Sequence, residues 1–287
     1  MEMTGSREVV LVVDVVRPEE KMLWHSLSAL NLKPKILNVN QVPLKMTECP
    51  GEIALIRPVS MFKAVYAAAA LEAGGCRCIN SSFSILYAGD KILSLTTLMR
   101  HGLPVVESVI AMHPQAALQV LLSQKKPVID KPPIGSWGRM VSLVKDSETA
   151  KMVVEHREAI PASQARIHII QEYIDTGRED IRCFVVAGEC LGCVKRIASD
   201  IEWRANVALG GRVEPLGEGV EELCELAIRA AGALKAFYAA VDILKPKGAS
   251  TVLINEINGV PEFKAFQKAT GIDVARALAE KVFEEFR

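Results

Sequence analysis

The chain lacks an excess of charge of either sign, and it lacks any long run of apolar residues. Its 34 basic and 34 acidic residues cancel over 287 positions. Nucleic-acid-binding surfaces concentrate positive charge, so this balance argues against nucleic acid as a partner. Half of the residues are hydrophobic, yet the apolar runs are far shorter than the roughly 20 residues that span a bilayer. We therefore expect a cytoplasmic protein that does not enter a membrane.

Several familiar motifs for nucleotides, nucleophiles and export are missing as well. No Gly-Lys-Ser/Thr triplet closes a Walker A loop, and Val-Asp-Val-Val-Arg-Pro at residues 13–18 stands where a nicotinamide-binding fold would carry glycines. No Ser-His-Asp or Cys-His arrangement indicates a side-chain nucleophile. The opening apolar stretch is expected to be a buried strand rather than a signal peptide, because no small-residue cleavage site follows it.

Cysteine is present, but without the pattern of a disulfide framework or a complete metal site. The chain has seven cysteines, an odd number. We expect them to be reduced thiols that pack as small hydrophobic side chains. Cys190 and Cys193 have zinc-like spacing, but no second pair completes four ligands and no histidine lies at a suitable distance. The spacing is therefore interpreted as a cysteine pair in a hairpin.

The hydrophobic pattern indicates an α/β (α+β) chain with two or three small lobes. From the first strand to about residue 85, apolar strands alternate with helix-like stretches, which is typical of a small parallel sheet. The expected strands are Val9–Val16, Lys35–Val39 and Ile53–Ile56, and the expected helices are Glu19–Leu30 and Ala64–Ala73.

The rest of the chain divides into a central and a C-terminal region near residue 174. The central region is expected to hold a helix, a strand pair around a glycine-bearing turn, and a helix–strand unit that ends in Ile167–Ile174. The C-terminal region is expected to hold strands between Ile181 and Ile197, a helix over Gly219–Tyr238, two short acidic strands and a closing helix over Asp273–Phe286.

Acidic and amide side chains lie on the two short strands near the C-terminus. Asp242 lies in one apolar stretch, and Glu256 and Asn258 lie in the next. Residues two apart on a strand point to the same face, so Glu256 and Asn258 are expected to face the same way. Asn255 and Ile257 are expected on the opposite face. Carboxylate and amide oxygens suit Mg²⁺ bound to a nucleotide, and a solvated loop without metal is the alternative.

A glycine-bearing loop with basic residues could cover the phosphates of such a nucleotide. Residues 131–139, Lys-Pro-Pro-Ile-Gly-Ser-Trp-Gly-Arg, join two apolar segments. Glycines let backbone N–H groups approach phosphate oxygens, and Lys131 and Arg139 place positive charge at the two ends of the loop. A plain structural hairpin is the alternative interpretation of the same pattern.

Two further segments could complete a nucleotide site. Lys91 is in the first turn of an expected helix, where an ordinary surface lysine would also be found. The stretch Ile167–Ile174 is apolar and ends in a polar-aromatic tetrad, and its backbone groups could bind an adenine edge. The alternative for this stretch is a strand with no ligand.

In this order along the chain, the motifs resemble those of the ATP-grasp superfamily, and within it the RimK-like ligases that act on an amino-group carrier protein in lysine and arginine biosynthesis. The resemblance implies an ATP-grasp fold with an N-terminal pre-ATP-grasp α/β domain (1–85), a central domain with the lid loop (86–174) and a C-terminal domain with the Mg²⁺ and substrate sites (175–287). The matching stretches are residues 56–61, 89–91, 131–139, 171–174, 180–182, 203–211 and 255–264.

The resemblance also implies a role for each motif residue in binding ATP and two Mg²⁺ ions. Phosphates would be contacted by Lys91 and Lys131 and covered by Gly135, Ser136, Trp137 and Gly138; adenine and ribose would be held by Gln171, Glu172, Ile174 and Asp180. The metal ligands would be Asp242, Glu256 and Asn258, and the transferring phosphoryl group would be stabilised by Arg182, Arg204 and Asn206. Substrate carboxylates would be handled near Arg57, Glu262 and Lys264.

For the reaction, the resemblance implies that ATP activates the C-terminal glutamate of a small acidic carrier protein as an acyl phosphate. The α-amino group of glutamate or of α-aminoadipate then forms an amide. Gly259-Val260-Pro261 resembles the branch that uses glutamate. Ligation of glutamate to another protein's C-terminus, or synthesis of a small dipeptide, is the alternative within the family, and a nucleotide-binding regulator is the alternative outside catalysis. Relatives of this kind imply a homodimer or a homotetramer.

Overall fold

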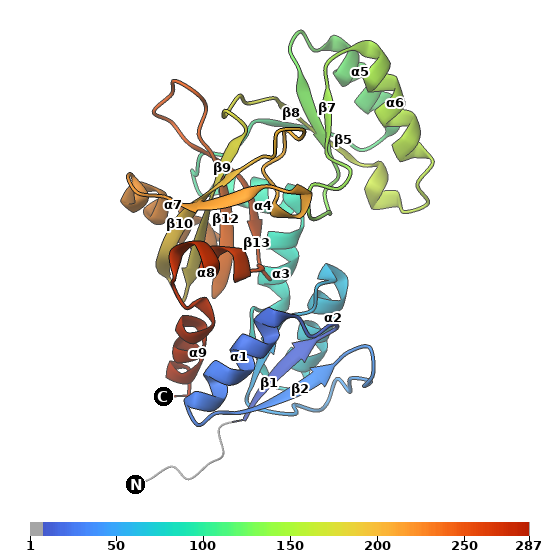
Figure 1. Ribbon diagram of the computed structural model, residues 1–287. Helices are drawn as coiled ribbons and strands as arrows, with labels where there is room; N and C mark the ends of the chain where they lie inside the picture. The colour runs from blue at the N-terminus through green and yellow to red at the C-terminus, as the bar shows by residue number, and fades with distance from the viewer. Residues whose placement is uncertain (1–7, 287) are drawn as a thin grey trace.

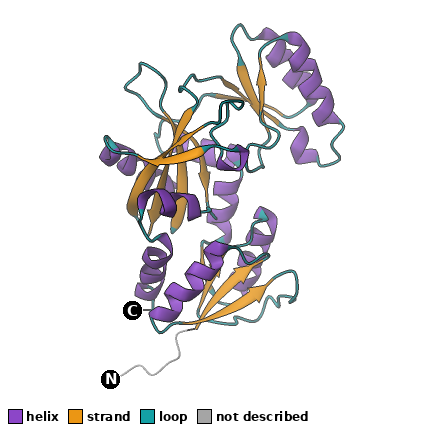
Figure 2. Ribbon diagram, viewed as in Figure 1, coloured by secondary structure: helices purple, strands orange, loops and turns teal. Residues whose placement is uncertain are grey.

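Three β-sheets, each with its own helices, are formed by successive parts of the chain (Figures 1 and 2). The structure is a computed structural model that describes residues 8–286. Residues 1–7 of the expected first domain and residue 287 of the third lie outside the described residues. The C-terminal sheet lies in the middle of the molecule, with the N-terminal sheet on one side and the central sheet on the other (Figure 1).

The N-terminal sheet is parallel, as predicted, with strand order β2-β1-β3-β4. The first strand is shorter than expected, because the Asp14 carboxylate accepts hydrogen bonds from the backbone N–H groups of Val59 (2.8 Å) and Ser60 (3.1 Å), and the chain turns away from the sheet there. The elements are β1 (Glu8–Val13), α1 (Pro18–Ala29), β2 (Lys33–Asn38), β3 (Ile53–Ile56), α2 (Met61–Ala73) and β4 (Arg77–Ile79).

The central sheet is antiparallel, with strand order β5-β8-β6-β7. Its β6 and β7 form the predicted strand pair around the glycine-bearing loop, with Val128 opposite Val144. Two helices cover the face on which Val128, Val144 and Ile170 are buried. The elements are β5 (Ser108–Ala111), α5 (Pro114–Ser123), β6 (Val128–Lys131), β7 (Ser142–Val144), α6 (Ser147–Glu158), the 3₁₀ turn Ser163–Arg166 and β8 (His168–Glu172).

The C-terminal sheet is antiparallel, with strand order β11-β10-β9-β12-β13. The helix expected over Gly219–Tyr238 ends at Ala233, because Lys235 adopts a left-handed φ of 52° and Ala236 N–H bonds back to the carbonyl of Ala231 (2.9 Å). The elements are β9 (Glu179–Val186), β10 (Glu189–Ile197), the 3₁₀ turn Val207–Leu209, β11 (Arg212–Pro215), α7 (Val220–Ala233), β12 (Tyr238–Leu244), β13 (Leu253–Asn258), α8 (Lys264–Thr270) and α9 (Val274–Glu284).

The segment between the first two sheets packs on the C-terminal sheet. Helices α3 (Ser82–Gly89) and α4 (Lys91–Arg100) contact β13. The backbone N–H of Ile254 on β13 bonds to the carbonyl of Pro104 (2.8 Å), which fixes the chain that leaves α4. Lys91, the first residue of α4, therefore lies beside the C-terminal sheet. The boundaries at residues 85 and 174 stay predictions.

Buried polar contacts attach the N-terminal sheet to the strands expected to hold metal. The Asn80 side chain is 1% exposed; it donates to the carbonyls of Tyr238 (2.6 Å) and Gly259 (2.8 Å) and accepts from Phe237 N–H (2.6 Å). Helix α9 also packs on α1, so that apolar residues of the N- and C-terminal regions share one core. These contacts fix where β12 and β13 lie relative to the first sheet.

The expectation of reduced cysteines is wrong for six of the seven. Disulfides join Cys49 to Cys76, Cys183 to Cys193 and Cys190 to Cys224. Cys78 alone keeps a free thiol, and burial raises the pKa of that thiol to about 12. The paired cysteines are 10 to 34 residues apart along the chain, and only sheet pairing and helix packing bring them together.

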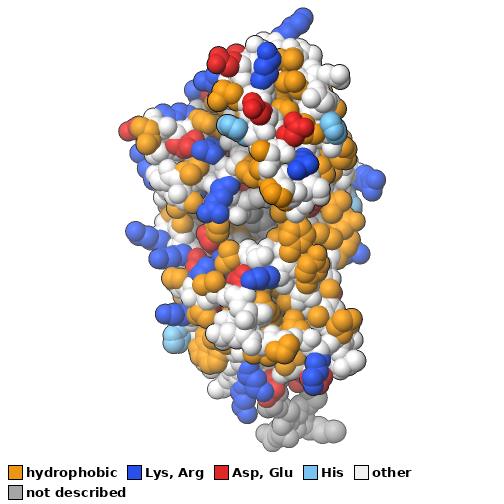
Figure 3. Space-filling view, turned by 90° about the vertical axis from the view of Figure 1, so that its right-hand side faces the viewer, with side chains coloured by type: hydrophobic (Ala, Val, Ile, Leu, Met, Phe, Trp, Pro, Cys, Tyr) orange, Lys and Arg blue, Asp and Glu red, His pale blue; other side chains and the backbone are white. Residues whose placement is uncertain are grey.

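The surface carries charges of both signs. On the face drawn in Figure 3, basic and acidic side chains are interspersed with hydrophobic ones, which matches the balanced composition. Within residues 8–286, no helix is both long enough and apolar enough to cross a membrane.

Candidate active site

One cleft of about 1010 Å³, open solvent included, is lined by residues of the central and the C-terminal sheets. All of the residues predicted to bind the nucleotide line it: Lys91, Lys131, Gly135, Ser136, Trp137, Gly138, Gln171, Glu172, Ile174 and Asp180. Arg204, Asn206 and Glu256 line the same cleft. Segments that are distant in the sequence thus converge on one site.

Two buried lysines lie in the cleft beside acidic and amide oxygens. Lys91 is 7% exposed, and its Nζ donates to the carbonyl of Gly135 (3.0 Å) and lies 3.5 Å from a carboxylate oxygen of Glu256. Lys131 is 4% exposed, and its Nζ donates to Oδ1 of Asn255 (3.0 Å). Lysines are seldom buried to this extent. A cleft that holds two of them is suited to an anionic ligand.

The glycine-bearing loop closes on the segment that follows β10. Arg204 Nη1 donates to the carbonyl of Gly138 (2.6 Å), and the guanidinium of Arg139 lies over the Trp137 ring, 5.0 Å from its centroid. Gly138 has a φ of 70°, and a Cβ there would stand 2.9 Å from Oδ1 of Asn206. A side chain at residue 138 would therefore both strain the backbone and collide with Asn206.

A row of arginines and aspartates crosses the C-terminal sheet. Asp242 is fully buried; Arg182 donates to both of its oxygens (2.6 and 2.7 Å), and Arg196 lies 2.9 Å away. Arg196 also donates to both oxygens of Asp180 (2.5 and 2.7 Å). Burial alone would raise the pKa of Asp242, but the two arginines outweigh it and hold that pKa well below its usual range.

In β13, contrary to expectation, side chains do not alternate strictly between the two faces of the sheet. Asp242 pairs with Glu256, but the next residue of β12, Ile243, pairs with Ile254, so Asn255 is an extra residue in β13. Such a bulge lets two successive side chains serve the same side of a strand. Asn255 and Glu256 both line the cleft, which corrects the prediction that Asn255 faces away from it.

Residues 88–282 match the model of the RimK-like ATP-grasp domain. The chain belongs to the RimK-like ATP-grasp family. It is 45% identical to the glutamate–LysW ligase ArgX of Sulfolobus acidocaldarius, over 96% of this chain and 97% of that protein. It is 30% identical to the α-aminoadipate–LysW ligase LysX of Sulfurisphaera tokodaii, over 81% of each. The crystal structure of a RimK-domain ATP-grasp protein from Sphaerobacter thermophilus matches with a TM-score of 0.75 at 21% identity, covering 96% of this chain and 99% of that one.

In this ATP-grasp cleft, the segment expected to bind adenine presents backbone rather than carboxylate. The Glu172 carboxylate turns out to solvent, where Lys126 pairs with it (2.7 Å). Gln171 is 4% exposed and donates to Ser108 Oγ (2.7 Å). Any contact of Glu172 with a base would thus be made by its main chain, in line with the edge-binding role expected for this strand.

The structure does not bring every predicted site residue to the cleft. Arg182, Asp242 and Asn258 lie on the strands beneath it and do not line it. The substrate candidates Arg57, Glu262 and Lys264 are also absent from the lining.

Arg57, Glu262 and Lys264 instead lie where the N-terminal sheet meets α8. Arg57 is 0% exposed and donates to Glu20 (3.1 Å) and to the carbonyl of Pro261 (3.0 Å). Glu262 lies 3.4 Å from Arg17, and the backbone N–H of Lys264 bonds to Glu19 (3.3 Å). Their role towards substrate stays a prediction, and for Arg57 the structure shows a buried link between two regions of the chain.

Sequence reasoning missed Arg196 and Asn255. Arg196 pairs with both Asp180 and Asp242. If the register of the β9–β10 hairpin had been predicted from the sequence, it would have placed Arg196 opposite Asp180. Asn255 could not have been found in this way, because its place depends on the bulge. Both residues line the cleft.

The charge of Lys131 makes nucleotide affinity depend on pH. Burial lowers the pKa of Lys131 to about 8; Glu256 opposes this shift and Lys91 adds to it. The free protein therefore loses this charge as the pH rises through about 8, and nucleotide phosphates, which favour the charged form, must restore it. We expect ATP to bind about tenfold more weakly near pH 9 than near pH 7 because of this group, as measured by calorimetry in buffers of different ionisation enthalpy.

The matched control for the pH dependence is Lys131→Arg. An arginine keeps its charge throughout this range, so the variant should show a flat profile and no proton uptake at the higher pH. A wild-type protein whose ATP affinity is constant over the same range would contradict the assignment.

Proposed function

We propose that the protein is an ATP-dependent ligase that joins glutamate to the C-terminal glutamate of a small acidic carrier protein of the LysW type. The observation that carries the proposal is the 45% identity to a glutamate–LysW ligase over 96% of the chain, compared with 30% to an α-aminoadipate–LysW ligase. The cleft with two buried lysines agrees with a nucleotide as one of the substrates.

The reaction would proceed in two steps. A side-chain carboxylate oxygen of the carrier's terminal glutamate attacks the γ-phosphorus of ATP, and the bond from that phosphorus to the ADP oxygen breaks. The α-amino group of free glutamate then attacks the acyl carbon and loses a proton. The carbon–nitrogen bond forms as phosphate leaves. No side chain of the protein needs to act as a nucleophile.

Within this scheme, the cleft residues bind and orient charged groups. Lys91 and Lys131 hold the phosphates, and the loop with Gly138 excludes water above them. Arg204 reaches that loop from the opposite wall, where it can hold the transferring phosphoryl group. Fixed donors aimed at developing charge usually supply the largest part of catalysis.

Two Mg²⁺ ions are proposed on Asp242, Glu256 and Asn258, and the residues fit such ions. Glu256 is partly exposed to the cleft, and the ligand atom that Asn258 would offer is its amide oxygen, because magnesium takes oxygen ligands. Both Asp242 oxygens accept from arginines, but a carboxylate has about four lone-pair sites and can still ligate an ion. When bound, magnesium neutralises charge on the phosphates as the phosphoryl group moves.

The choice of glutamate over α-aminoadipate also rests on the segment after β13. Gly259 is packed closely: a Cβ there would lie 3.1 Å from the Cβ of Ala88. Gly259-Val260-Pro261 directly follows β13, and a side chain at residue 259 would crowd α3. One methylene in a pocket changes binding by only about 1–3 kcal/mol, so use of both amino acids is the second candidate function.

Incubation with ATP, Mg²⁺, the carrier protein and either amino acid tests the proposal. We expect the intact mass of the carrier to rise by one glutamate residue when glutamate is supplied, with little gain when aminoadipate is supplied. Equal gains would indicate a ligase that accepts both. A carrier whose mass is unchanged with either amino acid, although ATP binds, would overturn the assignment. A carrier that lacks its terminal glutamate is the matched control and should gain nothing.

A further inference from the structure

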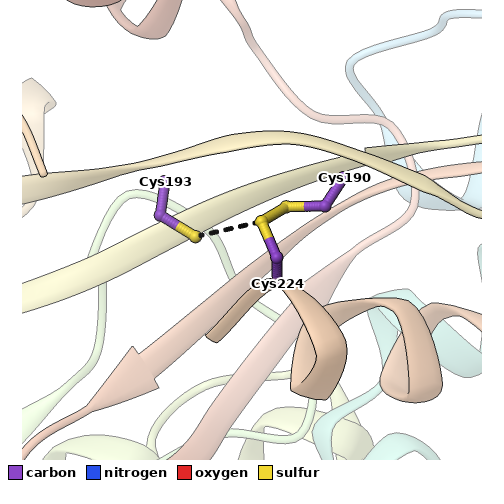
Figure 4. A group of neighbouring side chains, drawn as sticks. All are labelled: Cys190, Cys193 and Cys224. Atoms are coloured by element: carbon purple, nitrogen blue, oxygen red, sulfur yellow. Dashed lines mark hydrogen bonds between the residues drawn. A yellow bond between two sulfur atoms is a disulfide. The ribbon is translucent and has the colours of Figure 1, made fainter. Parts of the chain in front are cut away.

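Four cysteines gather behind the sheet that carries the arginine and aspartate row. Cys183 is on β9, Cys190 and Cys193 are on β10, and Cys224 is on α7. Figure 4 shows the side chains of Cys190, Cys193 and Cys224 pointing toward one another between strand and helix. The Sγ atoms of Cys193 and Cys224, which belong to different disulfides, are 3.9 Å apart. The Sγ atoms of Cys190, Cys193 and Cys224 all lie within 4.8 Å of one another.

A bulge in β10 is what gathers these sulfurs. Cys190 and Cys193 are three residues apart, and on a regular strand an odd spacing would place them on opposite faces. Cys190 pairs with Val185 and Gly192 pairs with Phe184, so Leu191 is an extra residue. Gly192 takes a φ of 136°, which a side chain rarely allows. Both cysteines consequently face α7, and Cys193 stands opposite Cys183.

The four cysteines lie in one apolar core between sheet and helix. Cys183 is 0% and Cys193 is 4% exposed, and Cys190 and Cys224 are partly buried against the same cluster. Sulfur is thus supplied from three elements: the Sγ atoms of Cys190, Cys193 and Cys224 form the close group, and Cys183 is joined to it through its disulfide with Cys193. The Cys-x-x-Cys spacing noted in the sequence gains its second pair from β9 and α7.

We propose that the reduced form of this four-cysteine cluster binds one zinc ion. Zinc in structural sites takes four thiolates in a tetrahedron, and a Zn–S bond of about 2.3 Å puts neighbouring sulfurs about 3.8 Å apart. The Cys193–Cys224 separation already has this value. A set of soft sulfur ligands favours zinc over magnesium or calcium. The cluster is separate from the magnesium ligands, so this inference does not depend on the proposed ligase activity.

Zinc binding and disulfide formation exclude each other at this cluster. A dithiol reductant gives each disulfide two electrons and two protons and becomes a cyclic disulfide itself. The two reductions together leave four thiols, which release four protons as they bind one Zn²⁺. The ion would cross-link β9, β10 and α7, the same elements that the two disulfides join in the structure.

Metal analysis of the whole protein tests the proposal. Protein prepared with a dithiol and zinc, then separated from free metal by gel filtration, should carry about one zinc ion per chain. Protein kept oxidised, and given zinc without the dithiol before the same gel filtration, should carry none. Cobalt in place of zinc should give the thiolate-to-metal absorption of a tetrahedral sulfur site in the reduced wild type. Both measurements use the wild-type protein, so a folding defect of a variant cannot affect the result.

Cys224→Ser and Cys49→Ser form the matched pair of variants. Cys224→Ser removes one ligand and should lower zinc retention at least tenfold. Cys49→Ser breaks the distant disulfide with Cys76 and should retain zinc as the wild type does. Reduced wild type without bound metal and without the cobalt absorption would show that the cysteines form structural disulfides only. Equal retention by the two variants would likewise overturn the site.

Discussion

Glu256→Gln should abolish glutamate transfer while leaving the protein folded. The substitution keeps the size of the side chain but removes the carboxylate that faces Lys91 in the cleft (3.5 Å). Metal ions contribute several kcal/mol to stabilising charge in phosphoryl transfer, which corresponds to about a thousandfold in rate. We expect kcat to fall by at least that factor, as followed by the intact mass of the carrier protein.

Glu280→Gln is the control for Glu256→Gln. Glu280 lies on α9, and its side chain, which is 45% exposed, pairs with Arg276 one turn away. This variant should have wild-type activity and a wild-type thermal transition. The role given to Glu256 would be wrong if Glu256→Gln kept activity within tenfold of the wild type. Restored activity at high Mg²⁺ would indicate weakened metal binding rather than a lost catalytic step.

Asp242→Ala should destabilise the fold by about 3–5 kcal/mol, because it leaves buried cations without a counter-ion. Arg196 is 5% and Arg182 is 18% exposed, and Asp242 lies between them. Asp180 still pairs with Arg196, but Arg182 loses both of its hydrogen bonds to carboxylate. The melting temperature should fall by roughly 10 °C.

The exposed pair of Asp175 and Lys247 provides the control for this loss of stability. Its side chains are 60% and 63% exposed and lie 3.5 Å apart. Exposed pairs contribute at most about 1 kcal/mol, so Asp175→Ala should melt close to the wild type. If Asp242→Ala and Asp175→Ala lowered the melting temperature equally, the buried arrangement would not carry the stability assigned to it.

The Asp242 carboxylate pairs with two arginines and is proposed as a magnesium ligand, and its pKa is compatible with both roles. Asp242 is held ionised by Arg182 and Arg196 in spite of full burial. Its folded-state pKa is lowered, so its contribution to stability is present above the ordinary pKa of an aspartate. That contribution is lost as the pH falls towards the lower folded value. Across the neutral range the carboxylate is therefore available to a cation.

The convergence of the predicted nucleotide-binding residues on one cleft was foreseeable because they were recognised by residue type and by order along the chain. The lysines, the glycine-bearing loop, the segment 167–174 and the acidic strands each carry their own local signal, and all ten residues predicted to bind the nucleotide line one cleft. The parallel first sheet and the hairpin of β6 and β7 were predicted for the same reason, since strand patterns are local.

The wrong predictions concern features that depend on pairing between segments far apart in the sequence. The helix expected to reach Tyr238 stops at Ala233, because Tyr238 begins a strand between β9 and β13. Asn255 faces the cleft because β13 bulges against β12. The cysteines pair because β10 bulges against β9 and α7 packs beneath it.

By itself, the sequence determined the order of most strands and helices and, through the resemblance of its motifs, the family to which the chain belongs. The strands and helices follow from hydrophobic period and turn residues, which are read within a few residues, and the resemblance rests on side-chain types in a fixed order along the chain. Only the tertiary structure decided which side chains touch: the partners of Asp242, the turn of Asn255 into the cleft and the meeting of four sulfurs. One extra residue in a strand reverses the face of every side chain beyond it, and whether a strand carries one depends on the partner strand with which it pairs.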